Sequence, residues 1–103
     1  MCGGGNGGGE QAAEDGVISI EAGDLYFDPE QVSAQAGTIE FELVNVGAVE
    51  HDLVIEEAGD TEVVYAEPGE TVTGSIDLEP GTYTYYCSIP GHRPTMEGTL
   101  EVS

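Results

Sequence analysis

The feature that most limits the fold of this chain is a series of short runs in which apolar and polar residues alternate. In the clearest run, Thr38–Val46, the side chains of Ile39, Phe41 and Leu43 would share one face, and the residues between them the other. A period of two residues is typical of a β-strand with one buried face. Runs of this kind predict strands over residues 17–22, 30–35, 38–46, 51–56, 61–66, 71–78, 82–87 and 97–103.

The connections between these runs favour one compact all-β domain. Turn-forming pairs such as Asp28-Pro29, Pro68-Gly69 and Pro80-Gly81 separate the runs, and no stretch has the period of a helix. Short strands at regular spacing are typical of a β-sandwich. We therefore predict an all-β Greek-key β-sandwich of about eight strands over residues 17–103, in a chain of 103 residues.

The first 16 residues have a different composition, with six glycines between positions 3 and 9. Glycine at this density indicates a flexible tether, because it offers little apolar surface to bury. A cysteine followed by such a tether resembles the start of a mature lipoprotein, in which Cys2 would carry the lipid and Met1 would be an added start residue. The alternative is a linker with an incidental thiol. We do not expect a Cys2–Cys87 disulfide, because Cys2 lies in the tether rather than in a packed segment.

The balance of charge is strongly acidic, with one Lys or Arg against 21 Asp and Glu and a formal net charge of −20. Such a surface repels nucleic acids and anionic lipid headgroups, and it attracts a partner with a basic face at low salt. A near absence of lysine also resembles proteins of salt-loving organisms, although an acidic protein of no special habitat would have the same composition. No apolar run approaches the roughly 20 residues of a membrane-spanning helix.

Three scarce residue types are concentrated near the C-terminus in a C-x4-H-x3-M pattern formed by Cys87, His92 and Met96. The other histidine of the chain, His51, begins a predicted strand, where the alternation points it to the same face as Leu53. The same alternation delivers Cys87 to the inner face at the end of the strand over residues 82–87. Two imidazoles, a thiolate and a weak thioether are the ligands of a blue-copper site, although zinc also accepts such ligands.

Each of these residues also has an ordinary structural interpretation. Cys87 could be a buried thiol, His51 a hydrogen-bonded core histidine and Met96 a gap-filling side chain. Cys87 and His92 could also form a nucleophile and base, but that chemistry needs an orienting third group and an oxyanion hole, of which the sequence shows no sign. The agreement of spacing with strand alternation favours the metal site, and we expect no enzymatic activity.

The segment Cys87–Met96 (CSIPGHRPTM), with PGTYTYYC ending at Cys87 and MEGTL beginning at Met96, resembles the ligand loop of the cupredoxins. The resemblance covers about Val17–Ser103. It implies one type 1 copper ion bound by His51, Cys87, His92 and Met96. The implied function is one-electron transfer between a donor and an acceptor redox protein outside the cytoplasm, by a monomer. The alternative is a module that stores or delivers copper.

The resemblance also implies supporting contacts around the ligands. The backbone N–H of Asp52 would donate to the Cys87 sulfur, and the N–H of Ile89 could donate a second bond. The Asp52 carboxylate could accept from the Ser88 hydroxyl and so connect the two ligand segments. Tyr83 would form a tyrosine corner by bonding back to the preceding turn.

One face around His92 is expected to be the route of electron exit. In the cupredoxins this histidine emerges through an apolar surface patch, to which Ile89, Pro90 and Pro94 would contribute here. Arg93, the only basic side chain of this chain, would then mark the rim of a docking surface or would simply be solvated.

Overall fold

The computed structural model describes residues 11–12 and 17–103. The predicted tether therefore lies outside the described residues, apart from the short strand β1 (Gln11–Ala12), which pairs in parallel with β4 (Gln31–Ala34). Cys2, the candidate lipid attachment site, also lies outside them.

The described residues form two β-sheets. One sheet has the strand order β1-β4-β10-β9-β6-β7, and the other has the order β3-β2-β5-β8. The remaining strands are β2 (Val17–Gly23), β3 (Tyr26–Asp28), β5 (Gly37–Asn45), β6 (His51–Ile55), β7 (Thr61–Ala66), β8 (Thr71–Leu78), β9 (Gly81–Tyr86) and β10 (Glu97–Val102). A single 3-10 turn, η1 (Glu56–Ala58), interrupts the strands in this part of the chain.

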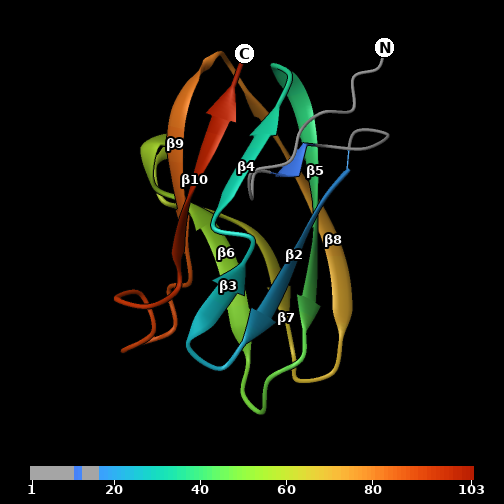
Figure 1. Ribbon diagram of the computed structural model, residues 1–103, viewed down its shortest axis with the longest axis vertical. Coiled ribbons are helices and arrows are strands. Elements are labelled where there is room, and N and C mark those ends of the chain that lie inside the picture. Colours follow the sequence, from blue (N-terminus) through green and yellow to red (C-terminus); the bar gives the residue numbers. More distant parts are fainter. Residues whose placement is uncertain (1–10, 13–16) are drawn as a thin grey trace.

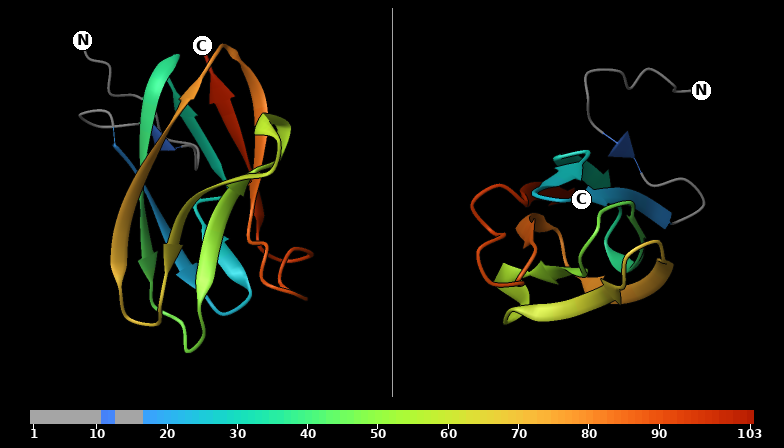
Figure 2. Two further views of the ribbon diagram at one scale, coloured as in Figure 1. Left: turned by 180° about the vertical axis from the view of Figure 1, so that it is seen from behind. Right: turned by 90° about the horizontal axis from the view of Figure 1, so that it is seen from below.

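The two sheets face each other and enclose the core, as the views in Figures 1 and 2 show. The alternating residues of β5 point inward as predicted, because Ile39, Phe41 and Leu43 are all buried. Ile18 and Ile20 of β2 are buried beside them. Burial of one face of each sheet against the other is what stabilises a sandwich. The predicted all-β sandwich is therefore confirmed.

Two details of the strands differ from the prediction. Residues 26–28, which lie between two of the predicted strands, form β3, which pairs with β2 and buries Phe27. In β8, Val72 and Ile76 are only partly buried, because β8 is the edge strand of its sheet.

The antiparallel pairing of β6, β9 and β10 brings three chain segments to one end of the sandwich. Val54 pairs with Tyr86, so the first residue of β6 lies beside the chain that leaves β9. Tyr86 also pairs with Glu97, so β10 begins at the same end. The segment that follows Cys87 and leads to β10, residues 88–96, is here called the ligand loop, and it lies at the lower left of Figure 1.

The turn before β9 is fixed by the predicted tyrosine corner. The hydroxyl of Tyr83 donates to the carbonyl oxygen of Glu79 at 2.8 Å. Within the ligand loop, Gly91 has a φ of +84°, a left-handed conformation that glycine adopts without steric strain. The chain therefore turns tightly just before His92.

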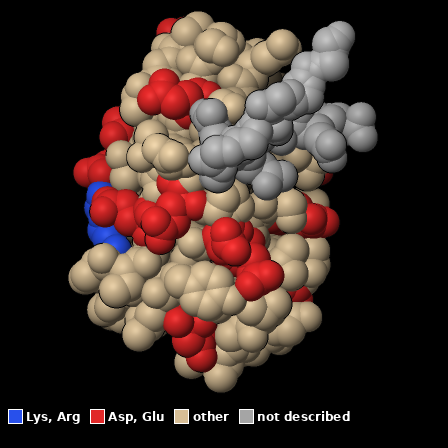
Figure 3. Space-filling view, in the orientation of Figure 1, with Lys and Arg blue, Asp and Glu red and all other residues tan. Residues whose placement is uncertain are grey.

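The surface is acidic over much of the molecule. Figure 3 shows acidic groups spread over the visible face and one blue group, Arg93, at its left edge. The lower left of that view, where the ligand loop lies, shows no acidic group, and residues 88–96 contain none. No helix among the described residues has the length and apolar character needed to cross a membrane.

Candidate metal centre

Three of the four predicted ligands converge at the end of the sandwich. The Sγ atom of Cys87 lies 3.8 Å from Nδ1 of His51 and 3.6 Å from Nδ1 of His92. The ligand atoms of the three residues all lie within 4.8 Å of one another. Cys87 and His51 are fully buried and His92 is half-buried, so water has limited access to the cluster.

These separations fit a single shared metal ion. A nitrogen and a sulfur bound to one ion at about 2.0 Å and 2.3 Å, with an angle of about 120° between the bonds, would lie about 3.7 Å apart. The two observed nitrogen-to-sulfur separations lie on either side of this value. Two imidazole nitrogens and a thiolate in a trigonal set suit copper by their chemistry.

The environment of Cys87 favours a sulfur that becomes charged only when a cation is present. Burial raises the pKa of the Cys87 thiol, while hydrogen bonds from the backbone N–H groups of Asp52 and Ile89 partly oppose that rise. A metal ion would stabilise the thiolate, as it does for coordinating thiols generally. The direction of this effect agrees with the two predicted N–H contacts to the sulfur, which stay predictions.

Met96, the fourth predicted ligand, is joined to two members of this cluster by backbone hydrogen bonds. Its side chain is fully buried. Its carbonyl oxygen accepts from the backbone N–H of Cys87 at 3.1 Å, and its own N–H donates to the carbonyl oxygen of His92 at 3.1 Å. The backbone thus holds Met96 close to both residues. Coordination by its thioether stays a prediction.

A buried carboxylate connects the two segments that carry the ligands. The Asp52 side chain, which is 1% exposed, accepts from the backbone N–H of Ser88 at 2.6 Å and from the Ser88 hydroxyl at 2.5 Å. The hydroxyl contact was predicted and is confirmed. Because Asp52 follows His51 and Ser88 follows Cys87, the pair fixes the spacing of two candidate ligands.

The Arg93 side chain is held by neighbouring side chains, and its positive charge is paired with two carboxylates. Its guanidinium forms ion pairs with Glu56 of η1 and Glu97 of β10, and it stacks 3.9 Å from the centre of the Tyr86 ring. These contacts attach the ligand loop to three neighbouring elements, η1, β9 and β10. Arg93 therefore has a structural role that the sequence did not predict, and its place at the rim of a docking surface stays a prediction.

Two residues that support the site were not identified from the sequence. Asn45 is buried, and its side-chain amide donates to the carbonyl oxygens of Val49 and Ala66. Asp24 lies with its Oδ1 atom 3.3 Å from Nε2 of His51. An Asn at a strand end and an Asp in a turn are common, so neither had a local signal that pointed to the histidine.

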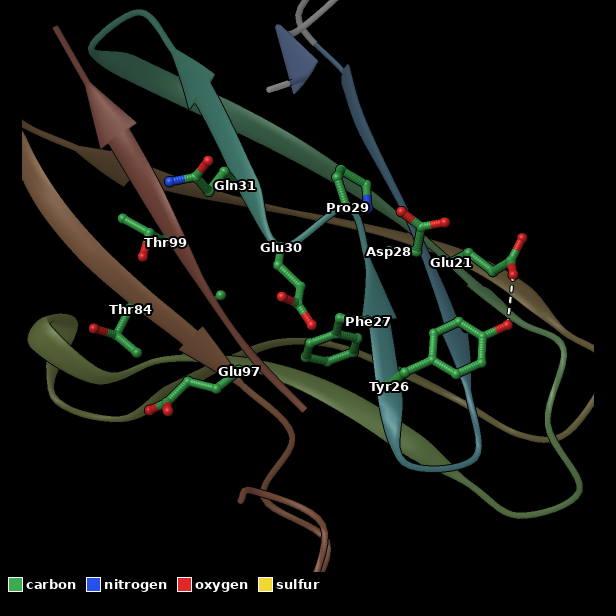
Figure 4. A pocket seen from close by; sticks show the side chains of 11 residues that line it. Glu21, Tyr26, Phe27, Asp28, Pro29, Glu30, Gln31, Thr84, Glu97 and Thr99 are labelled. Carbon is green, nitrogen blue, oxygen red and sulfur yellow. Dashed lines mark hydrogen bonds between the residues drawn. The ribbon is translucent and has the colours of Figure 1, made fainter. Parts of the chain in front are cut away.

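A second concave region lies away from the ligand cluster, beside β3 and β10, with a volume of about 1030 Å³. Figure 4 shows that most of its ionisable groups are carboxylates, and that the Tyr26 hydroxyl bonds to Glu21. The region is lined by Glu21, Tyr26, Phe27, Asp28, Pro29, Glu30, Gln31, Thr84, Glu97, Gly98 and Thr99. It contains no imidazole or thiol, so the ligand cluster is the stronger candidate for a functional site.

Solved structures of blue copper proteins share this fold. Auracyanin A, a "blue" copper protein from Chloroflexus aurantiacus, is 28% identical, with a TM-score of 0.70 and coverage of 85% of this chain and 100% of that chain. Dithionite-reduced auracyanin from Roseiflexus castenholzii is 23% identical, with a TM-score of 0.71 and coverage of 85% and 97%. An azurin from Methylomonas sp. strain J is 18% identical, with a TM-score of 0.69 and coverage of 84% and 97%.

Among curated proteins, none matched the sequence. The sequence does match the family model described as the cupredoxin-like domain, over residues 7–102. That match includes β6 with His51, the residue Cys87 and the whole ligand loop. Since it spans nearly the entire chain and implies the sandwich that is observed, the protein belongs to the family of cupredoxin-like domains.

Proposed function

We propose that this protein is a one-electron carrier that holds a single type 1 copper ion between His51, Cys87 and His92, with Met96 as a weak axial ligand. The observation that carries the proposal is the convergence of one thiol and two imidazole Nδ1 atoms in a buried site. A bound copper ion in such a site accepts and releases one electron by cycling between Cu(II) and Cu(I).

The chain contributes rigidity to this chemistry. Fast electron transfer requires ligands that move little between the two oxidation states, because each movement adds to the barrier. His51 is held at the start of β6 and Cys87 just after β9, and Asp52 connects the two segments through Ser88. Pro90 and Pro94 restrict the backbone of the ligand loop. The similarity to auracyanin A, a blue copper protein, supports the same metal here.

The route for the electron would pass through His92. This histidine is half-buried, whereas His51 is fully buried. The loop around His92 exposes Pro90 and Pro94 and carries no acidic residue. We infer that a redox partner approaches this face, which carries no acidic residue, while the acidic surface around it attracts basic groups on the partner.

The remaining parts of the proposal rest on the sequence. An extracytoplasmic location suits a blue copper carrier, and Cys2 with its glycine-rich segment would tether the domain to a membrane through a lipid. We expect a monomer that exchanges electrons with a donor and an acceptor protein and that has no substrate of its own.

Copper storage or delivery is the alternative function. A delivery protein transfers its metal through exposed and exchangeable ligands. Here Cys87, His51 and Met96 are each 0% exposed, which favours retention of the ion. The colour of the loaded protein separates the two functions, because a store of Cu(I) is colourless.

The test is to load Cu(II) into the wild type and into the variants Cys87→Ser and Cys2→Ser. We expect the wild type to show an intense thiolate-to-copper band near ~600 nm and a reversible one-electron reduction. Cys87→Ser should lose the band, and Cys2→Ser should keep it, since Cys2 is the other thiol of the chain and is not a predicted ligand. A blue Cys87→Ser protein, or a wild type that binds only colourless Cu(I), would overturn the proposal.

A further inference from the structure

We propose that Asp24 is the positioning residue for His51: its carboxylate accepts the Nε2–H of the imidazole, directs Nδ1 toward the metal and favours the oxidised ion. The last part of this inference rests on the proposed function, whereas the contact itself does not. Asp24 lies in the turn between β2 and β3, 27 residues before His51.

The Asp24 carboxylate joins three segments. Its Oδ1 atom lies 3.3 Å from Nε2 of His51, and both of its oxygens accept from the backbone N–H of Ala48, at 3.0 Å and 3.1 Å. The turn before β3 is thereby attached to the loop between β5 and β6 and to the first residue of β6. The carboxylate is half exposed, but the imidazole that it contacts is fully buried.

The backbone on both sides is shaped to allow this contact. A Cβ atom on Gly47 would lie 2.2 Å from Oδ1 of Asp24 and 3.0 Å from its backbone nitrogen, so only glycine permits the loop to approach so closely. On the other side, Leu25 has a φ of +71°, in the left-handed region that non-glycine residues seldom adopt. Strained or sterically exacting positions of this kind accumulate around functional sites.

The contact determines which imidazole nitrogen is available to a metal. Both oxygens of Asp24 accept from the backbone N–H of Ala48, so the carboxylate serves as an acceptor in this turn. A carboxylate in that role leaves Nε2 of His51 as the donor of their contact. In the neutral imidazole Nδ1 then has a free lone pair, and this is the nitrogen that faces the Cys87 sulfur at 3.8 Å.

The charge of Asp24 has a second effect. A carboxylate that accepts from a ligating histidine makes the imidazole a stronger donor and adds negative charge near the ion. Both effects stabilise Cu(II) more than Cu(I), which lowers the reduction potential. Replacing the carboxylate by an amide would keep an acceptor for Nε2–H but remove the charge. Asp24→Asn should therefore raise the potential, whereas Asp24→Ala should also release the ring.

The contact is tested by NMR on full-length wild type, Asp24→Asn and Asp24→Ala, with Asp28→Asn as a matched loss of charge on the same hairpin. Imidazole ¹⁵N shifts are recorded for the metal-free and Zn(II) forms at about pH 8, where an ordinary imidazole of pKa roughly 6.5 is neutral. We expect the Nε2–H tautomer of His51 in the metal-free wild type, Asp24→Asn and Asp28→Asn proteins, and a mixture of tautomers in Asp24→Ala. Zn(II) affinity should fall about 10-fold or more in Asp24→Ala and should be largely restored in Asp24→Asn.

The same proteins loaded with copper test the effect on the potential. Asp24→Asn should shift the reduction potential to more positive values than Asp28→Asn does, while retaining the blue band. Equal shifts in these two variants would overturn the effect on the potential, and an unchanged His51 tautomer in Asp24→Ala would overturn the positioning role. If the wild type failed to turn blue, the proposed function would fail, but the tautomer in the metal-free protein would still decide the contact.

Discussion

Asp52 is a buried acidic side chain among residues that are otherwise mainly apolar, and its two oxygens are occupied by one neighbour. Both accept from Ser88, one from the backbone N–H and one from the hydroxyl. Hydrogen bonds to a charged group are stronger than neutral ones, and a buried group left without its partner has a large desolvation penalty. Asp52 thus connects the two segments that carry His51 and Cys87, and it is not itself one of the candidate ligands.

Removal of this carboxylate should destabilise the metal-free protein. We expect Asp52→Ala to lower the free energy of unfolding by about 1.5–3 kcal/mol, as measured by urea denaturation. Ser88→Ala should have a smaller effect, about 1 kcal/mol, because the Ser88 backbone N–H still donates to Asp52. Equal losses in the two variants would show that the hydroxyl alone accounts for the contact.

At the scale of single residues, the sequence predicted the site residues that lie in one local motif. It missed those that reach the site only through contacts between segments far apart in the chain. Cys87 and His92 stand close together in a recognisable spacing, and Ser88 follows Cys87 directly. Asp24 is 27 residues from His51, in a turn whose side-chain direction no local pattern determines. A contact of that kind depends on how the hairpin of β2 and β3 packs against the end of β6.

Among the strands, alternation predicted the buried face wherever one side of the strand is open to water. This held for β2 and β5. It was insufficient for β6, which is buried at every position, because Asp52 on its other face is covered by the start of the ligand loop. It also missed β3, whose three residues are too few to show a period.

Gly98 in β10 tests how tightly the elements beside the ligand loop are packed. A Cβ atom at this position would lie 2.3 Å from Cζ of Tyr85. The Tyr85 ring has little room to move, because it is fully buried and its hydroxyl donates to the carbonyl oxygen of Pro29 at 2.6 Å. Gly98→Ala should therefore lower the free energy of unfolding by about 1–3 kcal/mol.

The control for that variant is Glu101→Ala in the same strand, whose side chain is exposed and accepts from Thr82. Chemical denaturation of the metal-free forms would compare the two, and the control should change stability by about 0.5 kcal/mol or less. A Gly98→Ala protein as stable as the control would mean that the Tyr85 ring has space to adjust.

At the scale of the whole molecule, charge is poorly balanced. The formal net charge is −20, on a domain with a radius of gyration of 12.8 Å over its Cα atoms. The one arginine is paired with Glu56 and Glu97, so it does little to reduce the repulsion among the other carboxylates. The sequence predicted this imbalance fully, since it needs only a count of residues, but it did not predict where the single cation would be placed.

Repulsion among these carboxylates should make stability depend on salt. The Debye length falls from about 30 Å at 0.01 M to about 8 Å at 0.15 M ionic strength, so added salt screens most of the repulsion across a domain of this size. We expect the melting temperature to rise as sodium chloride increases over that range at neutral pH.

The same titration near pH 4.3, where about half of ordinary glutamates are protonated, should show a smaller rise, because less charge remains to be screened. This comparison separates charge screening from a general effect of salt on apolar burial, which would be similar at both pH values. A melting temperature that does not change with salt at neutral pH would contradict the expected repulsion. It would also count against an adaptation of this sequence to saline conditions.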